Sequence, residues 1–115
     1  MSALAHIDVI NDAAAAKQVV LVIEDERTQR MVLRSALERE GFRVVEASSG
    51  PEGLEAFDHI RPDIVLLDVR MPGMDGFATC AALRQREGGD RFPILMVTVL
   101  NDVESINRAY EVGAT

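Results

Sequence analysis

Short apolar runs in this chain alternate with apolar residues at helical spacing, and this alternation predicts its secondary structure. The runs predict four strands, at Val19–Ile23, Arg43–Ala47, Ile64–Leu67 and Pro93–Val97. The helical spacing predicts helices over Thr28–Glu40, after a cap and early proline in Ser48-Ser49-Gly50-Pro51, around Phe77–Leu83 and from Asn101 to Gly113. Four strand–helix units in succession indicate an α/β fold with a parallel sheet and helices on both faces.

The domain boundary is predicted just before the first strand. Residues 1–17 are expected to form a leader that is mobile or loosely helical, because Ala13–Ala16 favour a helix while Asp8 and Asn11 interrupt any apolar face. Residues 18–115 are expected to form one domain, a length sufficient for a modest core.

Charge and cysteine content narrow the classes of function. The formal net charge of −7 makes direct binding to nucleic acid or to an anionic membrane unfavourable. The single cysteine, Cys80, has no partner for an intrachain disulfide, which fits a reducing compartment. No apolar stretch approaches the roughly 20 residues of a transmembrane helix, so we expect a cytoplasmic protein.

Acidic residues follow two of the predicted strands. Glu24 and Asp25 come directly after the first strand, and Asp68 comes directly after the third. Carboxyl ends of parallel strands meet at one edge of a sheet, so we expect the three side chains to converge there. Two carboxylates about 4 Å apart repel by about 4 kcal/mol at an effective dielectric of 20, and Mg²⁺ would neutralise them. One carboxylate could then attack phosphorus and form an aspartyl phosphate.

Thr98 follows the fourth predicted strand, at the same edge of the sheet. Its hydroxyl is expected to face the crevice beside the acids, where it could donate a hydrogen bond to a phosphoryl oxygen. Such a bond would pull the threonine inward and rearrange the loop and helix that follow, which is a conformational switch.

The order of these motifs resembles the receiver domain of bacterial two-component response regulators. The resemblance covers roughly residues 19–115. It rests on four segments, namely Val22-Ile23-Glu24-Asp25-Glu26, Asp63 to Gly76 with its Met71-Pro72-Gly73-Met74-Asp75 loop, Pro93-Ile94-Leu95-Met96-Val97-Thr98, and Gly113-Ala114.

The resemblance implies a flavodoxin-like doubly wound sheet of strand order 2-1-3-4-(5). It implies that Asp68 accepts a phosphoryl group from a histidine kinase or phosphotransfer protein. It also implies that Asp25, Asp68 and the backbone carbonyl of Arg70 bind Mg²⁺, with Glu24 completing the pocket mostly through water. Thr98 would be the switch hydroxyl, and an effector domain or partner would receive the signal. The only catalysis expected is of the chain's own phosphorylation and dephosphorylation.

Several positions depart from the family pattern. Val99 stands where the family has a small residue, and its bulk is expected to narrow access to the phosphate. Leu100 stands where a polar residue is common, and this apolar side chain is expected to slow attack by water on the phosphate. The sequence printed here stops at Thr115, before the family's fifth strand, its lysine and its fifth helix; the one lysine present is Lys17. A chain ending there would leave apolar surface uncovered unless the natural protein continues, a second copy covers the surface or the leader folds over it. We expect continuation, and self-association as a homodimer if the chain does end at Thr115.

Three alternative functions, and one possible output of a receiver domain, were also considered. A phosphatase of the haloacid dehalogenase type would need a second acid where Arg70 stands. A flavodoxin-like cofactor binder would need a glycine-rich phosphate loop where Glu24-Asp25-Glu26 stands. A phosphorylation-independent interaction module would fit the missing lysine. The stretch from Asn101 to Thr115 looks most like receivers joined to cyclic-di-GMP enzymes.

Overall fold

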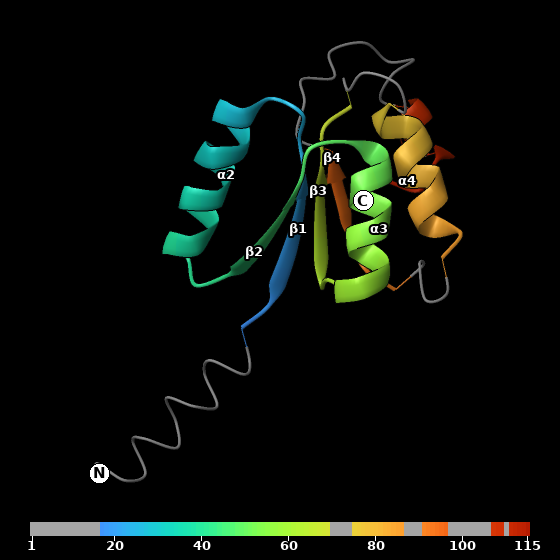
Figure 1. Ribbon diagram of the computed structural model, residues 1–115. Coiled ribbons are helices and arrows are strands. Elements are labelled where there is room, and N and C mark those ends of the chain that lie inside the picture. Colours follow the sequence, from blue (N-terminus) through green and yellow to red (C-terminus); the bar gives the residue numbers. More distant parts are fainter. Residues whose placement is uncertain (1–16, 70–74, 87–90, 97–106, 110) are drawn as a thin grey trace, which may run out of the picture.

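The computed structural model describes residues 17–69, 75–86, 91–96, 107–109 and 111–115. Within them, four strands form one parallel sheet in the order β2-β1-β3-β4 (Figure 1). The strands are β1 (Val19–Ile23), β2 (Arg43–Ala47), β3 (Ile64–Leu67) and β4 (Ile94–Met96). This order confirms the predicted flavodoxin-like, doubly wound arrangement of the first four strands.

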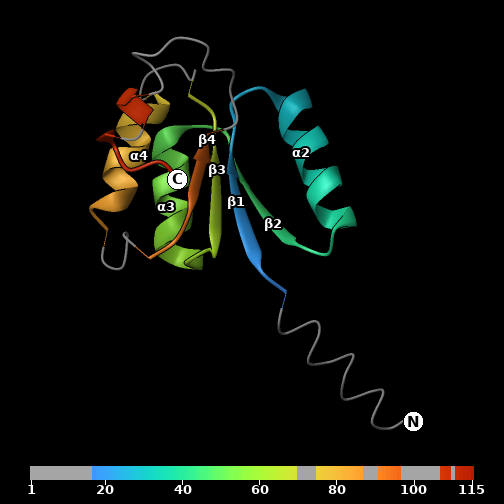
Figure 2. The ribbon, with the colours of Figure 1, turned by 180° about the vertical axis from the view of Figure 1, so that it is seen from behind.

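Helices cover both faces of the sheet. Figures 1 and 2 show α2 (Arg27–Arg39) on one face, and α3 (Gly50–Ile60) and α4 (Gly76–Arg84) side by side on the other. The predicted leader lies outside the described residues except for Lys17. Most of the helix predicted from Asn101 also lies outside them, although residues 107–109 are helical.

The core has two parts because the side chains of β1 alternate between the faces. Leu21 and Ile23 pack into the larger cluster with α3, α4 and β3, whereas Val20 and Val22 pack beneath α2. All four side chains are buried, as expected for a parallel strand with helices on both sides. This burial holds the carboxyl end of β1 at a fixed place in the fold.

Each helix begins at a side chain that accepts hydrogen bonds from its first turn. A cap was predicted within Ser48-Ser49-Gly50-Pro51, and the structure assigns it to Ser49, whose hydroxyl accepts from the Glu52 N–H at 3.2 Å. Asp75 caps α4 by accepting from the Ala78 N–H at 2.8 Å. Glu26 caps α2, so this helix begins one residue earlier than the predicted Thr28.

α2 is packed more loosely than the other two helices. None of its residues is buried, and Met31 and Val32 are 55% and 62% exposed. Leu33 and Leu37 provide its contact with the sheet. The helix ends at Arg39, and Gly41 follows with a φ of 94°, a left-handed conformation that glycine adopts without strain. This confirms the predicted stop at Gly41.

Among the helices in the described ranges, none is both long and apolar enough to cross a membrane.

Candidate functional site

Two neighbouring strands bring the acidic residues together. Ile23 of β1 pairs with Leu67 of β3, so the next residue of each strand leaves the sheet at the same edge. One carboxylate oxygen from each of Glu24, Asp25 and Asp68 lies within 4.8 Å of the others. The predicted convergence of these three carboxylates is therefore confirmed.

The backbone of this edge is tied to the sheet beyond the last strand residues. The Asp68 N–H donates to the Ile23 carbonyl at 2.9 Å, and the Glu24 N–H donates to the Ala47 carbonyl at 3.0 Å. These bonds extend the ladders that join β1 to β3 and to β2. They fix the backbone positions from which the side chains of Glu24 and Asp68 extend.

The three carboxylates differ in exposure. Glu24 and Asp68 are 3% and 8% exposed, whereas Asp25 is exposed to solvent. The Glu26 N–H donates to Glu24 Oε2 at 3.0 Å and holds this carboxylate in place. The cluster thus consists of two buried carboxylates and one that is exposed to solvent.

Burial changes the titration of Glu24. Its pKa is raised from 4.5 to about 7, mainly because burial removes water from the charged form, and the neighbouring Asp68 carboxylate raises it further. The hydrogen bond from the Glu26 N–H is the second largest effect on this pKa and lowers it. Glu24 therefore exchanges a proton near neutral pH while no cation is present.

The donor set suits a hard divalent cation. Three carboxylates supply oxygen ligands only, and Mg²⁺ binds such ligands while keeping several waters. A cluster of like charges in which two carboxylates are buried is also unfavourable without a counter-charge. The residues present thus fit the magnesium ion that the sequence predicted.

The backbone after Asp68 leaves no room beside the start of α4. The Gly76 N–H donates to the Val69 carbonyl at 2.9 Å. A Cβ at Gly76 would lie 2.3 Å from the Asp68 carbonyl oxygen and 2.5 Å from the Val69 Cα. Only glycine fits there, so α4 packs directly against the residue that carries the acid. Arg70 and Thr98, the other two predicted site residues, lie outside the described residues.

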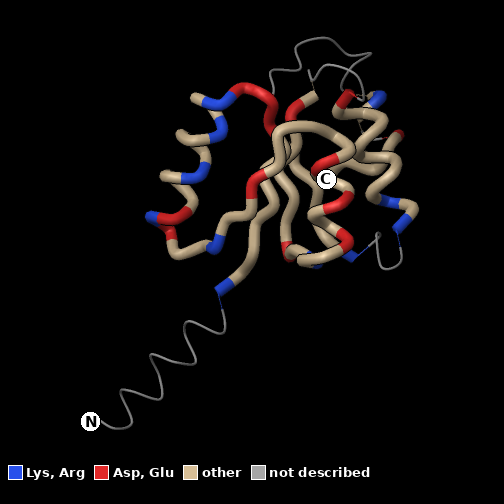
Figure 3. Tube along the Cα trace, in the orientation of Figure 1, with Lys and Arg blue, Asp and Glu red and all other residues tan. Residues whose placement is uncertain are grey.

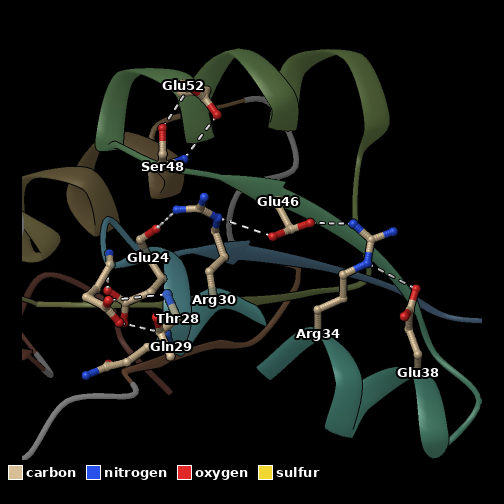
Figure 4. Close-up of polar contacts among 10 residues, drawn as sticks. Glu24, Thr28, Gln29, Arg30, Arg34, Glu38, Glu46, Ser48 and Glu52 are labelled. Atoms are coloured by element: carbon tan, nitrogen blue, oxygen red, sulfur yellow. Dashed lines mark hydrogen bonds and ion pairs between the residues drawn. The ribbon is translucent and has the colours of Figure 1, made fainter. Parts of the chain in front are cut away.

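An arginine that the sequence reasoning missed contacts the backbone of this site. Arg30, in the second turn of α2, donates from Nη1 to the Glu24 carbonyl at 2.9 Å and from Nε to Glu46 at 3.2 Å (Figure 4). No fixed spacing links Arg30 to Glu24 and Glu46, since the contact depends on how α2 packs on β2.

A pocket of about 220 Å³ opens beside Glu24 along α2.

Comparison with known proteins agrees with this geometry. The family model described as "Response regulator receiver domain" matches residues 20–115. The chain belongs to the response regulator receiver family. Within this family it is similar to the transcriptional regulatory protein AfsQ1 of Streptomyces coelicolor, with 40% identity over 95 residues, covering 83% of this chain and 41% of the relative.

Other receiver relatives support the same assignment. The probable transcriptional regulator ycf27 of Guillardia theta is 39% identical over 98 residues, which cover 85% of this chain and 37% of that protein. This chain therefore spans about two fifths of the length of these curated relatives. Among solved structures, the chemotaxis protein CheY4 of Vibrio cholerae superposes with a TM-score of 0.84 at 33% identity, covering 87% of this chain and 83% of that one.

Proposed function

We propose that residues 18–115 act as a phosphoacceptor, with Asp68 as the residue that is phosphorylated. The observation that carries this proposal is the cluster of Glu24, Asp25 and Asp68 oxygens, all within 4.8 Å, at the carboxyl edge of β1 and β3. The donor would be a phosphohistidine of a histidine kinase or a phosphotransfer protein. Residues 1–17 would form a leader outside this unit.

The reaction is a transfer between two side chains. A carboxylate oxygen of Asp68 attacks the phosphorus, the bond between phosphorus and the imidazole nitrogen breaks, and the imidazole leaves and takes up a proton. Of the three acids, Asp68 suits this role best. The carboxylate of Glu24 is held by the Glu26 N–H, and the side chain of Asp25 is exposed to solvent.

The cation would be Mg²⁺, held by Asp25, Asp68 and the Arg70 backbone carbonyl, with Glu24 acting mainly through water. When bound, Mg²⁺ supplies positive charge next to the transferring phosphoryl group. The protein itself would hold the carboxylates at one edge of the sheet and keep Asp68 largely out of water. Both effects follow from the burial of the carboxyl ends of β1 and β3.

The signal would leave the site through Thr98. Its hydroxyl would donate to a phosphoryl oxygen on Asp68, and the movement would alter the surface presented to an output domain or partner. Relatives that share this domain are named transcriptional regulators, and these names favour control of transcription as the output of the whole protein over a cyclic-di-GMP enzyme.

Intact mass spectrometry of the full chain tests the proposal. The chain would be incubated with Mg²⁺ and acetyl phosphate, and we expect a gain of one phosphoryl group. Asp68→Asn should abolish the gain, whereas Asp58→Asn, which changes an acid of α3 paired with Arg86, should not. A folded chain that gains no phosphoryl group would contradict the proposal and favour a phosphorylation-independent interaction module.

A further inference from the structure

Arg30 connects the acidic site to the far edge of the sheet. Its side chain is only 17% exposed, and its guanidinium lies between Glu46 of β2 and the Glu24 carbonyl (Figure 4). Glu46 also accepts from Arg34, one turn further along α2, and Arg34 in turn pairs with Glu38. These four side chains form a row of charges between α2 and β2, and Figure 3 shows that most charged positions of α2 are basic.

Within this row, Arg30 differs from Arg34 in what it binds. Arg34 contacts carboxylates only, and its side chain is 44% exposed. Arg30 contacts one carboxylate and one backbone carbonyl, and that carbonyl belongs to the peptide that joins Glu24 to Asp25. A hydrogen bond from a charged donor is stronger than a neutral one, so it constrains the orientation of this peptide.

We propose that Arg30 is a positioning residue of the phosphoacceptor site and that Glu46 orients it. The proposal rests on the function proposed above. Glu24 is the first residue after β1, and its backbone N–H is already held by the hydrogen bond to the Ala47 carbonyl. Arg30 holds the backbone carbonyl of Glu24, which belongs to the Glu24–Asp25 peptide. With both groups held, the Glu24 and Asp25 side chains start from defined directions towards Asp68.

The shape of the side chain matters as well as its charge. A guanidinium is planar and offers N–H groups on different edges, so Arg30 can bind Glu46 and the Glu24 carbonyl at the same time. A lysine ammonium is a single point on a flexible stem and would hold both groups less well. We therefore expect Arg30→Lys to retain only part of the effect.

Charge and positioning predict opposite effects on Mg²⁺ binding. If Arg30 acted only through its positive charge, its removal would strengthen cation binding, because one repulsive charge near the site would be lost. If Arg30 acts by orienting the peptide, its removal weakens cation binding. The direction of the change thus separates the two roles.

The experiment compares Arg30→Met with Arg34→Met in the full chain. Both variants remove one positive charge and one partner of Glu46, and only the first frees the Glu24 carbonyl. Mg²⁺ affinity would be measured by calorimetry, the rate of phosphorylation by acetyl phosphate by mass spectrometry, and the free energy of unfolding in urea. We expect about tenfold weaker Mg²⁺ binding in Arg30→Met, in the range for residues that orient metal ligands. Arg34→Met should stay within about twofold of wild type.

Three results would overturn the inference. These are unchanged or tighter Mg²⁺ binding in Arg30→Met, an equal loss in both variants, or an Arg30→Lys variant with the full Met defect. If Arg30→Met does not fold, Arg30→Lys carries the test, because it keeps the positive charge, and we expect weaker Mg²⁺ binding in it. If the wild-type chain binds Mg²⁺ and is phosphorylated, and the Arg30 variants behave like it, only the role of Arg30 is refuted. If the wild-type chain neither binds Mg²⁺ nor is phosphorylated, the proposed function is refuted as well.

Discussion

Glu24 and Asp68 come from segments far apart in sequence and lie side by side because Ile23 and Leu67 are paired across β1 and β3. This register places two largely buried carboxylates at one edge of the sheet. Their proximity contributes to the raised pKa of Glu24. A like-charge pair of this kind is unfavourable for the fold and favourable for binding a cation.

The pKa of Glu24 predicts how stability depends on pH. Its folded value of about 7 lies above its ordinary value of 4.5, so the folded state holds this proton more tightly than the unfolded state does. The free energy of unfolding should therefore fall as pH rises from about 4.5 to about 7, by on the order of 3 kcal/mol from this group when no divalent cation is present.

Urea titrations across this pH range in a chelating buffer would measure the effect. Glu24→Gln should flatten the profile, because glutamine does not titrate. Glu52→Gln, which changes an acid of α3 that accepts a hydrogen bond from Ser48, serves as the control and should keep the wild-type slope. An identical profile in wild type and Glu24→Gln would contradict the prediction.

Asp68→Asn should stabilise the chain when no divalent cation is present. The change removes one negative charge from a cluster in which the oxygens lie within 4.8 Å, and a gain on the order of 1 kcal/mol is expected from the lost repulsion. Excess Mg²⁺ should reduce or reverse the difference, since the wild type gains stability by binding it. Thermal unfolding with and without Mg²⁺ measures both effects. A less stable Asp68→Asn in chelating buffer would count against the repulsion.

Gly76→Ala should impair both stability and phosphorylation. The new methyl group would meet the backbone of Asp68 and Val69 at 2.3–2.5 Å, and backbone cannot move aside as a flexible side chain can. We expect a loss of at least 1–3 kcal/mol in the free energy of unfolding, typical of overpacking.

Gly41→Ala is the matched control for this change. It places a methyl group in open space but at a φ of +94°, so it should cost roughly 1–2 kcal/mol and leave phosphorylation intact. Urea unfolding and the acetyl phosphate assay would report the two properties separately. Normal phosphorylation of Gly76→Ala would show that α4 does not constrain Asp68.

Cys80 should be protected from thiol reagents in the folded chain. Its side chain is fully buried in the core, its Sγ donates to the Val112 carbonyl at 3.3 Å, and burial raises the pKa of the thiol. Labelling by a chromogenic disulfide should be slow in buffer and fast in urea, because the reactive species is the exposed thiolate. Cys80→Ala provides the blank. Rapid labelling under native conditions would mean that α4 opens readily.

Much of the site could be predicted from the sequence because it follows from local pattern and from sheet geometry. The apolar runs predicted the strands, and the position of Glu24, Asp25 and Asp68 directly after two of them predicted a cluster. Parallel strands bring their carboxyl ends to one edge, so this step needed no contact information. A helix cap within Ser48-Ser49-Gly50-Pro51 and the stop at Gly41 were likewise predicted from residue type.

The tertiary structure alone decided the features that depend on how helices pack on the sheet. The contact of Arg30 with Glu46 and the Glu24 carbonyl requires α2 to lie over β2, and no spacing in the sequence encodes it. The need for glycine at position 76 arises from the approach of α4 to Asp68. The raised pKa of Glu24 reflects burial by surrounding elements. Sequence patterns determine which face of an element is apolar, whereas packing determines which polar groups then meet.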